Sequence, residues 1–155
     1  MTEAAADAST EPSTTPGSTA IGGPAPTVHP ATILLVEDDE PLRTILARHL
    51  RARGHRVHEA GSAEAAADAL DRGLRPGLVL LDINLPGDTG WSLLRGEALG
   101  AAGDPPVIVA SATSVDPHRL REHRVAGYLP KPFPLQTLIE AIARLTVPIT
   151  GEVLE

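Results

Sequence analysis

Four short apolar runs in this chain each end on a polar or charged residue. In chain order, the runs and the residues that follow them are Leu34–Val36 with Glu37 and Asp38, Val79–Leu81 with Asp82, Val107–Ala110 with Ser111, and Tyr128–Pro130 with Lys131. Short continuous apolar runs are typical of strands buried on both faces of a parallel sheet. Because such strands end along one sheet edge, the pattern predicts that these polar groups share one pocket.

Helical patterns alternate with the strands. The predicted strands are Thr32–Val36, Arg56–Ala60, Leu78–Leu81, Val107–Ala110 and Gly127–Leu129. The predicted helices are Pro41 to a stop at Gly54, Ala63–Arg72, Trp91–Gly100, Pro117–Arg124 and Leu135–Leu145. This alternation predicts an α/β fold, a parallel sheet with helices on both faces.

Local signals place two helix starts and one apolar face. Asp39 and Ser62 are suited to cap the helices that follow them, because their side chains can accept hydrogen bonds from the first turn. The apolar face predicted for the first helix is the set at helical spacing, Leu42, Ile45, Leu46, His49 and Leu50.

Composition changes sharply near residue 31. Residues 1–31 are mostly Ala, Ser, Thr, Pro and Gly without apolar periodicity, which predicts a disordered low-complexity tail. The segment has neither the apolar run of a secretion signal nor the arginines of a transit peptide. We expect one domain over residues 32–147, a short C-terminal tail over 148–155, and no output domain.

Charge and composition exclude several classes of function. The net charge of −7 argues against direct nucleic-acid binding. No apolar run is long enough to cross a membrane. The absence of cysteine excludes thiolate metal sites and fits a reducing compartment. We therefore expect a cytoplasmic protein. No glycine-rich dinucleotide or phosphate-loop motif is present.

The acidic residues indicate a cation and phosphoryl chemistry. Asp82, at the end of a central strand, could act as a nucleophile toward phosphorus, although it could also simply cap the next loop. Glu37 and Asp38 beside it would repel it unless a cation intervened, and Mg²⁺ prefers such oxygen ligands. The alternative for this acidic run is a solvated helix N-terminus, which we assign to Asp39 and Glu40.

Lys131 is the only lysine among 13 basic residues, and it lies between Pro130 and Pro132. Its compact ammonium suits a position beside a carboxylate or phosphoryl oxygen, although a surface loop lysine is the simpler alternative. The Lys131-Pro132 bond is a candidate for a cis peptide. Ser111 could offer its hydroxyl to a phosphoryl oxygen or cap the next turn, with Thr113 and Ser114 as nearby rivals.

Together these residues resemble the receiver domain of two-component response regulators. The resemblance covers residues 32 to about 146. It is carried by Leu-Leu-Val-Glu-Asp-Asp at 34–39, Leu-Asp-Ile-Asn-Leu-Pro-Gly at 81–87 with Gly90, Ser-Ala at 111–112, and Gly-Tyr-Leu-Pro-Lys-Pro-Phe at 127–133. In this order and spacing the motifs are highly specific.

The resemblance implies a flavodoxin-like, doubly wound, five-stranded sheet of order 2-1-3-4-5. It implies that Asp82 is the phosphoacceptor for a sensor histidine kinase or phosphotransfer protein, and that an unknown downstream protein reads the result. Such a protein is not an enzyme in the usual sense. The implied roles are Mg²⁺ binding by Glu37 (through water), Asp38, Asp82 and the Asn84 backbone carbonyl, phosphoryl contacts by Lys131 and Ser111, an aromatic switch at Tyr128, and phosphate-lifetime tuning by Asn84 and Thr113.

Two features depart from the family pattern. The segment from Ser111 to Tyr128 is slightly short, and it lacks the Gly-Ala pair common before the switch strand. The expectation is a stand-alone receiver that signals by protein contacts. One alternative is a pseudo-receiver, a constitutive interaction module without phosphotransfer. Another is an aspartate-nucleophile phosphohydrolase, but such enzymes want a second Asp where this chain has Asn84.

Overall fold

The structure, a computed structural model, describes residues 29–87 and 89–146. One sheet is built from β1 Thr32–Val36, β2 Arg56–Ala60, β3 Leu78–Asp82, β4 Val107–Ser111 and β5 Gly127–Pro130. Its order is β2-β1-β3-β4-β5, and every neighbouring pair is parallel. This confirms the predicted doubly wound, flavodoxin-like α/β fold.

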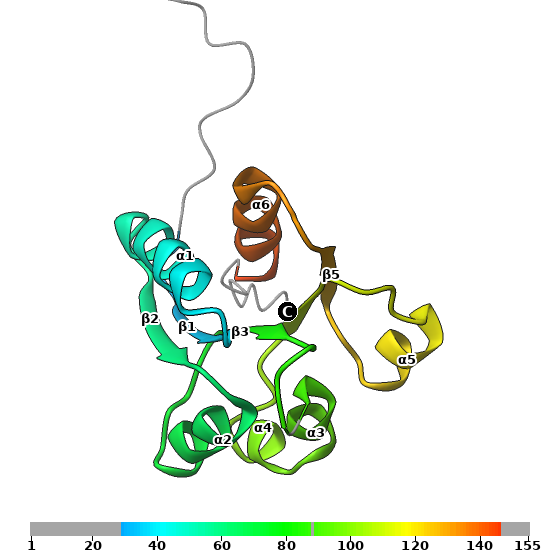
Figure 1. Cartoon of the computed structure of the whole chain (residues 1–155). Coiled ribbons are helices and arrows are strands. Elements are labelled where there is room, and N and C mark those ends of the chain that lie inside the picture. The colour runs from blue at the N-terminus through cyan, green and yellow to red at the C-terminus, as the bar shows by residue number, and fades with distance from the viewer. Residues whose placement is uncertain (1–28, 88, 147–155) are drawn as a thin grey trace, which may run out of the picture.

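The helices cover both faces of this sheet. They are α1 Glu40–Ala52, α2 Ala63–Asp71, α3 Gly90–Arg95, α4 Ala98–Ala101, α5 Pro117–Glu122 and α6 Leu135–Leu145. Helices α1 and α6 lie on one face, and α2, α3 and α4 lie on the other (Figure 1). Alternate residues of β1 enter the two cores, Ile33 on the α1 side and Leu34 on the α2 side.

The predicted caps are confirmed. Asp39 accepts a hydrogen bond from the backbone N–H of Leu42 at 3.2 Å, and Ser62 accepts one from Ala65 at 3.0 Å. Helix α1 buries Leu46 and Leu50 as expected, but Ile45 is 50% exposed. The apolar face predicted for α1 is therefore wider than the face that it buries.

The single helix predicted over Trp91–Gly100 is wrong, because two short helices replace it. Gly96 has extended backbone angles of φ −74° and ψ 175°, which end α3 at Arg95 before α4 begins at Ala98. Glycine is a poor helix former because ordering its backbone costs more entropy than for other residues. The apolar spacing on either side of Gly96 concealed this break.

Helix α5 ends two residues before its predicted end, at Glu122. Arg124 has a positive φ of 54°, a left-handed conformation that cannot continue the helix. None of the α5 residues is buried. Half-buried Leu120 packs against the core on the α2 side. Trp91 of α3 adds stacking contacts, with the guanidinium carbon of Arg119 4.0 Å from the indole ring centroid and the ring of His123, just after the helix, at 5.2 Å. Leu120 and the stacking on Trp91 together attach α5 to the rest of the fold.

The folded part begins at Ala31 or earlier. The Ala31 N–H donates to Nδ1 of His55 at 3.2 Å, and its carbonyl accepts from the N–H of Arg56 at 2.9 Å. Burial, helped by the charge of Arg53, lowers the pKa of His55. The predicted tail and the predicted C-terminal tail otherwise lie outside the described residues. Within residues 29–87 and 89–146, no helix has both the length and the apolar character needed to span a bilayer.

Candidate functional site

Lys131 bridges two carboxylates at the carboxyl edge of the sheet. Its Nζ donates to Oε1 of Glu37 at 2.6 Å and to Oδ2 of Asp82 at 3.1 Å. The side chains of Glu37 and Asp82 are 3% and 5% exposed, and that of Lys131 is 18% exposed. The three groups come from the ends of β1, β3 and β5, as the strand-end pattern predicts. The Lys131-Pro132 peptide is cis, also as expected.

Asp38 completes an acidic group with Glu37 and Asp82. Each of the three residues offers a carboxylate oxygen, and these atoms lie within 4.8 Å of one another. Asp38 is exposed, so the group opens to solvent on one side. Oxygen donors that leave room for water are what Mg²⁺ requires, since it retains several waters when bound. The residues present therefore fit Mg²⁺.

The two buried carboxylates have opposite pKa shifts. Desolvation, with the hydrogen bond and charge of Asp82, raises the pKa of Glu37 to about 7 against the opposing effect of Lys131. Desolvation tends to raise the pKa of Asp82 as well. Its hydrogen bonds with Glu37, the Asn84 N–H and Lys131 outweigh this effect, so the pKa of Asp82 lies below the ordinary value. Glu37 is therefore the group that can hold a proton near neutral pH, while Asp82 stays ionised.

The loop after β3 holds the second oxygen of Asp82. The backbone N–H of Asn84 donates to Oδ1 of Asp82 at 2.9 Å. Gly90, at the start of α3, packs directly under this loop. A Cβ at position 90 would lie 2.7 Å from the Asp82 carbonyl oxygen and 2.9 Å from the Cα of Ile83. The glycine is thus required by a close approach of two backbones, a reason that the sequence motif alone did not supply.

Ser111 belongs to a second polar network beside Asp82. Its hydroxyl donates to the Thr113 carbonyl at 2.8 Å and accepts from the Thr113 N–H and from Nδ2 of Asn84, both at 3.0 Å. The hydroxyl of Tyr128 donates to the same Thr113 carbonyl at 3.3 Å. Ser111 therefore caps the turn and also joins the site through Asn84. The Thr113 carbonyl, which accepts from both hydroxyls, connects Ser111 to Tyr128.

Sequence reasoning missed Arg43. Its Nη1 donates to the Glu37 backbone carbonyl at 2.8 Å, and its Nε pairs with Glu59 of β2 at 3.3 Å. The sequence gives no signal for this contact, because an arginine among the polar positions of a helix is usual. The contact depends on how α1 is rotated against β2.

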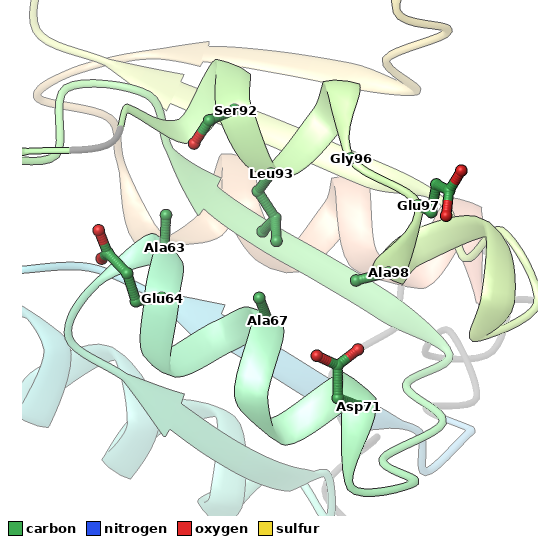
Figure 2. A pocket seen from close by; sticks show the side chains of 9 residues that line it. All are labelled: Ala63, Glu64, Ala67, Asp71, Ser92, Leu93, Gly96, Glu97 and Ala98. Carbon is green, nitrogen blue, oxygen red and sulfur yellow. The ribbon is translucent and has the colours of Figure 1, made fainter.

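Among the hollows outside the acidic group are one beside α2 and one beside α1. One of about 370 Å³ lies between α2 and the α3–α4 pair, where Figure 2 shows the carboxylates of Glu64, Asp71 and Glu97 around the side chains of Leu93 and three alanines. None of its lining residues belongs to the acidic group. The other, about 480 Å³, is an apolar groove that includes Ile45, Phe133 and Lys131, so it borders the candidate site.

The fold and the acidic pocket define a doubly wound domain with a lysine-bridged carboxylate site where the sheet order reverses, between β1 and β3. The chain belongs to the response regulator receiver domain family, whose profile it matches over residues 33–143. Members of this family are phosphoacceptor modules of two-component signalling rather than enzymes in the usual sense. They interact with histidine kinases or phosphotransfer proteins and bind Mg²⁺ at an acidic pocket.

Relatives and solved structures agree with this assignment. The transcriptional activator protein PfeR of Pseudomonas aeruginosa is 42% identical over 108 residues, 68% of this chain and 34% of that protein. The response regulator MprA of Mycolicibacterium vanbaalenii is 35% identical over 133 residues, 79% of this chain and 54% of that protein. The chain thus spans about a third of the first relative and about half of the second.

Two solved receiver structures illustrate the match. The receiver domain of the hybrid histidine kinase CckA is 34% identical with a TM-score of 0.62, covering 75% of this chain and 99% of that one. A CheY-like receiver protein from Methanospirillum hungatei has a TM-score of 0.69 at 23% identity, covering 75% and 93% of the two chains. At that identity the second likeness supports the fold alone.

Proposed function

We propose that Asp82 accepts a phosphoryl group from the phosphohistidine of a sensor histidine kinase or phosphotransfer protein. The observation that carries this proposal is the convergence at Asp82: Lys131 contacts its Oδ2, and the carboxylates of Glu37 and Asp38 lie beside it. A strand-end carboxylate kept ionised by an ammonium is a nucleophile that needs no separate general base. Catalysis of the transfer then reduces to positioning and charge neutralisation.

In the proposed step, one carboxylate oxygen of Asp82 forms a bond to phosphorus while the phosphorus–nitrogen bond of the phosphohistidine breaks. The leaving imidazole keeps the bonding electron pair and takes up a proton from water. The product is an acyl phosphate on Asp82. Lys131, which pairs with Oδ2 of Asp82 before transfer, would then bond a phosphoryl oxygen, because that group carries the new negative charge.

Mg²⁺ would be held by the carboxylates of Asp38 and Asp82 and by the Asn84 backbone carbonyl, with Glu37 acting through water. When bound, the ion neutralises charge on the transferring phosphoryl group. Burial and the neighbouring Asp82 raise the pKa of Glu37, and a cation beside these carboxylates would offset the repulsion between them.

After transfer, Ser111 would release the Thr113 carbonyl and donate to a phosphoryl oxygen. Tyr128, whose hydroxyl shares that carbonyl, would then turn inward. Asn84 and Thr113 border the same space and would tune the lifetime of the acyl phosphate. The altered surface would be read by a downstream protein, with no direct contact to nucleic acid. The apolar groove that includes Ile45 and Lys131 offers the kinase a docking surface beside Asp82.

Neither alternative function gains support from the site. A pseudo-receiver would have no need of the acidic group and the lysine, which are all present and in contact. A phosphohydrolase would need an acid or base at position 84, where the amide of Asn84 is instead bonded to Ser111. A cytoplasmic location, which the kinase partner requires, remains a prediction.

Phosphorylation by a small donor tests the proposal. We expect the full chain, incubated with acetyl phosphate and Mg²⁺, to gain the mass of one phosphoryl group, and to lose that gain when the metal is chelated. The Asp82→Asn variant keeps the shape of the side chain and should gain nothing. No gain in the wild type, or an equal gain in the variant, would overturn the proposal.

A further inference from the structure

The backbone of Glu37 is fixed on both sides. Its N–H donates to the Ala60 carbonyl of β2 at 3.0 Å, and its carbonyl accepts from Nη1 of Arg43 at 2.8 Å. The carbonyl belongs to the peptide that joins Glu37 to Asp38. Because a peptide unit is planar, a bond that fixes this carbonyl also fixes the direction in which the chain enters Asp38.

Asp38 depends on that backbone for its position. Throughout residues 29–87 and 89–146, no side chain or N–H donates to its carboxylate, whereas Glu37 and Asp82 are both held by Lys131. Asp38 is also exposed, so packing does not hold it. The orientation of the Glu37–Asp38 peptide therefore sets the point from which the Asp38 side chain extends toward the other two carboxylates.

Arg43 is itself held in place from β2. Its Nε pairs with Oε1 of Glu59 at 3.3 Å, and its side chain is only 19% exposed. A Cβ at Gly61 would lie 3.1 Å from Nη1, so the guanidinium fits against the chain just after β2. A guanidinium presents several donors in a rigid plane and can serve Glu59 and the Glu37 carbonyl at once.

We propose that Arg43 is a positioning residue of the cation site: by bonding the Glu37 carbonyl, it sets the place of the Asp38 carboxylate. This inference rests on the proposed function, because it assumes that Asp38 binds Mg²⁺. Arg43 does not touch the cation or the phosphoryl group. It acts through the backbone in the way that outer contacts of a metal site orient the inner ligands.

Arg51 provides a matched control within the same helix. Its Nη1 pairs with Oε2 of Glu59 at 3.0 Å and its Nη2 donates to a backbone carbonyl, that of Val57, at 2.8 Å. It therefore makes the same two kinds of contact as Arg43. The carbonyl that Arg51 bonds belongs to Val57, within β2, whereas Arg43 bonds the carbonyl of Glu37.

The test compares Mg²⁺ dissociation constants, measured calorimetrically on the full chain, for the wild type, Arg43→Gln, Arg43→Lys and Arg51→Gln. We expect Arg43→Gln to weaken Mg²⁺ binding roughly tenfold, the lower end for loss of an outer contact. The Mg²⁺ dissociation constant of Arg43→Lys should lie between those of the wild type and Arg43→Gln, because one ammonium cannot bond Glu59 and the Glu37 carbonyl at once. Arg51→Gln should bind Mg²⁺ like the wild type, and thermal unfolding of each variant separates a loss of stability from a loss of Mg²⁺ affinity.

Equal Mg²⁺ affinity in the wild type and a folded Arg43 variant would overturn the inference, and so would equal weakening by Arg51→Gln. If Arg43→Gln does not fold, Arg43→Lys provides the same comparison. Failure of the proposed function would look different. In that case the wild type would itself fail to bind Mg²⁺ or to take up a phosphoryl group from acetyl phosphate.

Discussion

Glu37 is a buried acid whose backbone N–H, backbone carbonyl and carboxylate are all hydrogen-bonded. Lys131 donates to its Oε1 and the N–H of Asp39 to its Oε2 at 3.3 Å, while its backbone carbonyl is bonded to Arg43. Its carboxyl is poised to exchange a proton near neutral pH. A cation and a proton therefore compete for the Glu37 carboxylate.

This competition predicts that Mg²⁺ binding depends on pH. The pKa of Glu37 is raised from 4.5 to about 7, so binding below that pH must displace a proton. We expect the Mg²⁺ dissociation constant to rise up to about tenfold for each unit of pH below about 7, and to level off above it. Calorimetry across that range measures this. The Glu37→Gln variant should show a flat profile, and a steep profile in that variant would contradict the assignment.

Lys131 neutralises carboxylates that otherwise repel each other. In Lys131→Met, which keeps the length of the side chain, the buried acids lose their ammonium. We expect the free energy of unfolding in urea to fall by roughly 3 kcal/mol without Mg²⁺. Part of this loss should return as Mg²⁺ is added, because the ion binds the folded state.

The matched control for Lys131 is Arg51→Met, in which a half-exposed arginine loses its ion pair with Glu59 and its hydrogen bond to the Val57 carbonyl. Such pairs contribute little, so the cost should be below about 1 kcal/mol. Equal costs for the two variants would contradict the role of Lys131, as would a loss in Lys131→Met that Mg²⁺ leaves unchanged.

At the scale of elements, α3 and the end of β3 are built around one close contact. The first residue of α3, Gly90, has room for no Cβ against the carbonyl of Asp82. The start of α3 and the end of β3 at Asp82 therefore cannot move independently. A side chain at this point must displace one of them.

Gly90→Ala should consequently disturb both stability and chemistry. We expect a loss of about 2 kcal/mol in unfolding free energy, as for other overpacked sites, and slower phosphorylation by acetyl phosphate. Gly100→Ala is the control, because a Cβ there meets only the Asp104 carboxylate at 3.8 Å. That variant should keep the wild-type phosphorylation rate. A wild-type phosphorylation rate in both variants would contradict the idea that the Gly90 contact positions Asp82.

At the scale of the whole molecule, the strand-end pattern predicted the pocket because each polar residue is the last of its strand or directly follows it. Glu37, Asp82 and Lys131 could be brought together from sequence for that reason. The Arg43 contact and the close approach of Gly90 could not, because both depend on how α1 and α3 sit against their strands. The break at Gly96 was concealed by apolar residues that satisfy a helical spacing on both sides.

The boundary of the folded unit yields one more prediction. Removing residues 1–28 should leave thermal unfolding and phosphorylation unchanged, since the tail is predicted to be disordered. Removing residues 1–31 also deletes the two backbone hydrogen bonds of Ala31. That truncation should cost about 2 kcal/mol, at about 1 kcal/mol for each bond. Urea denaturation of the two proteins measures the difference, and equal stability would place the boundary after Ala31.

The attachment of α5 to Trp91 has a practical consequence. Trp91 is the single tryptophan of the chain, and its ring contacts Arg119 in α5 and His123 just after that helix. Any displacement of α5 must change the surroundings of this indole. The protein thus carries an intrinsic fluorophore where α3 meets α5, and its emission spectrum can follow that contact without an added label.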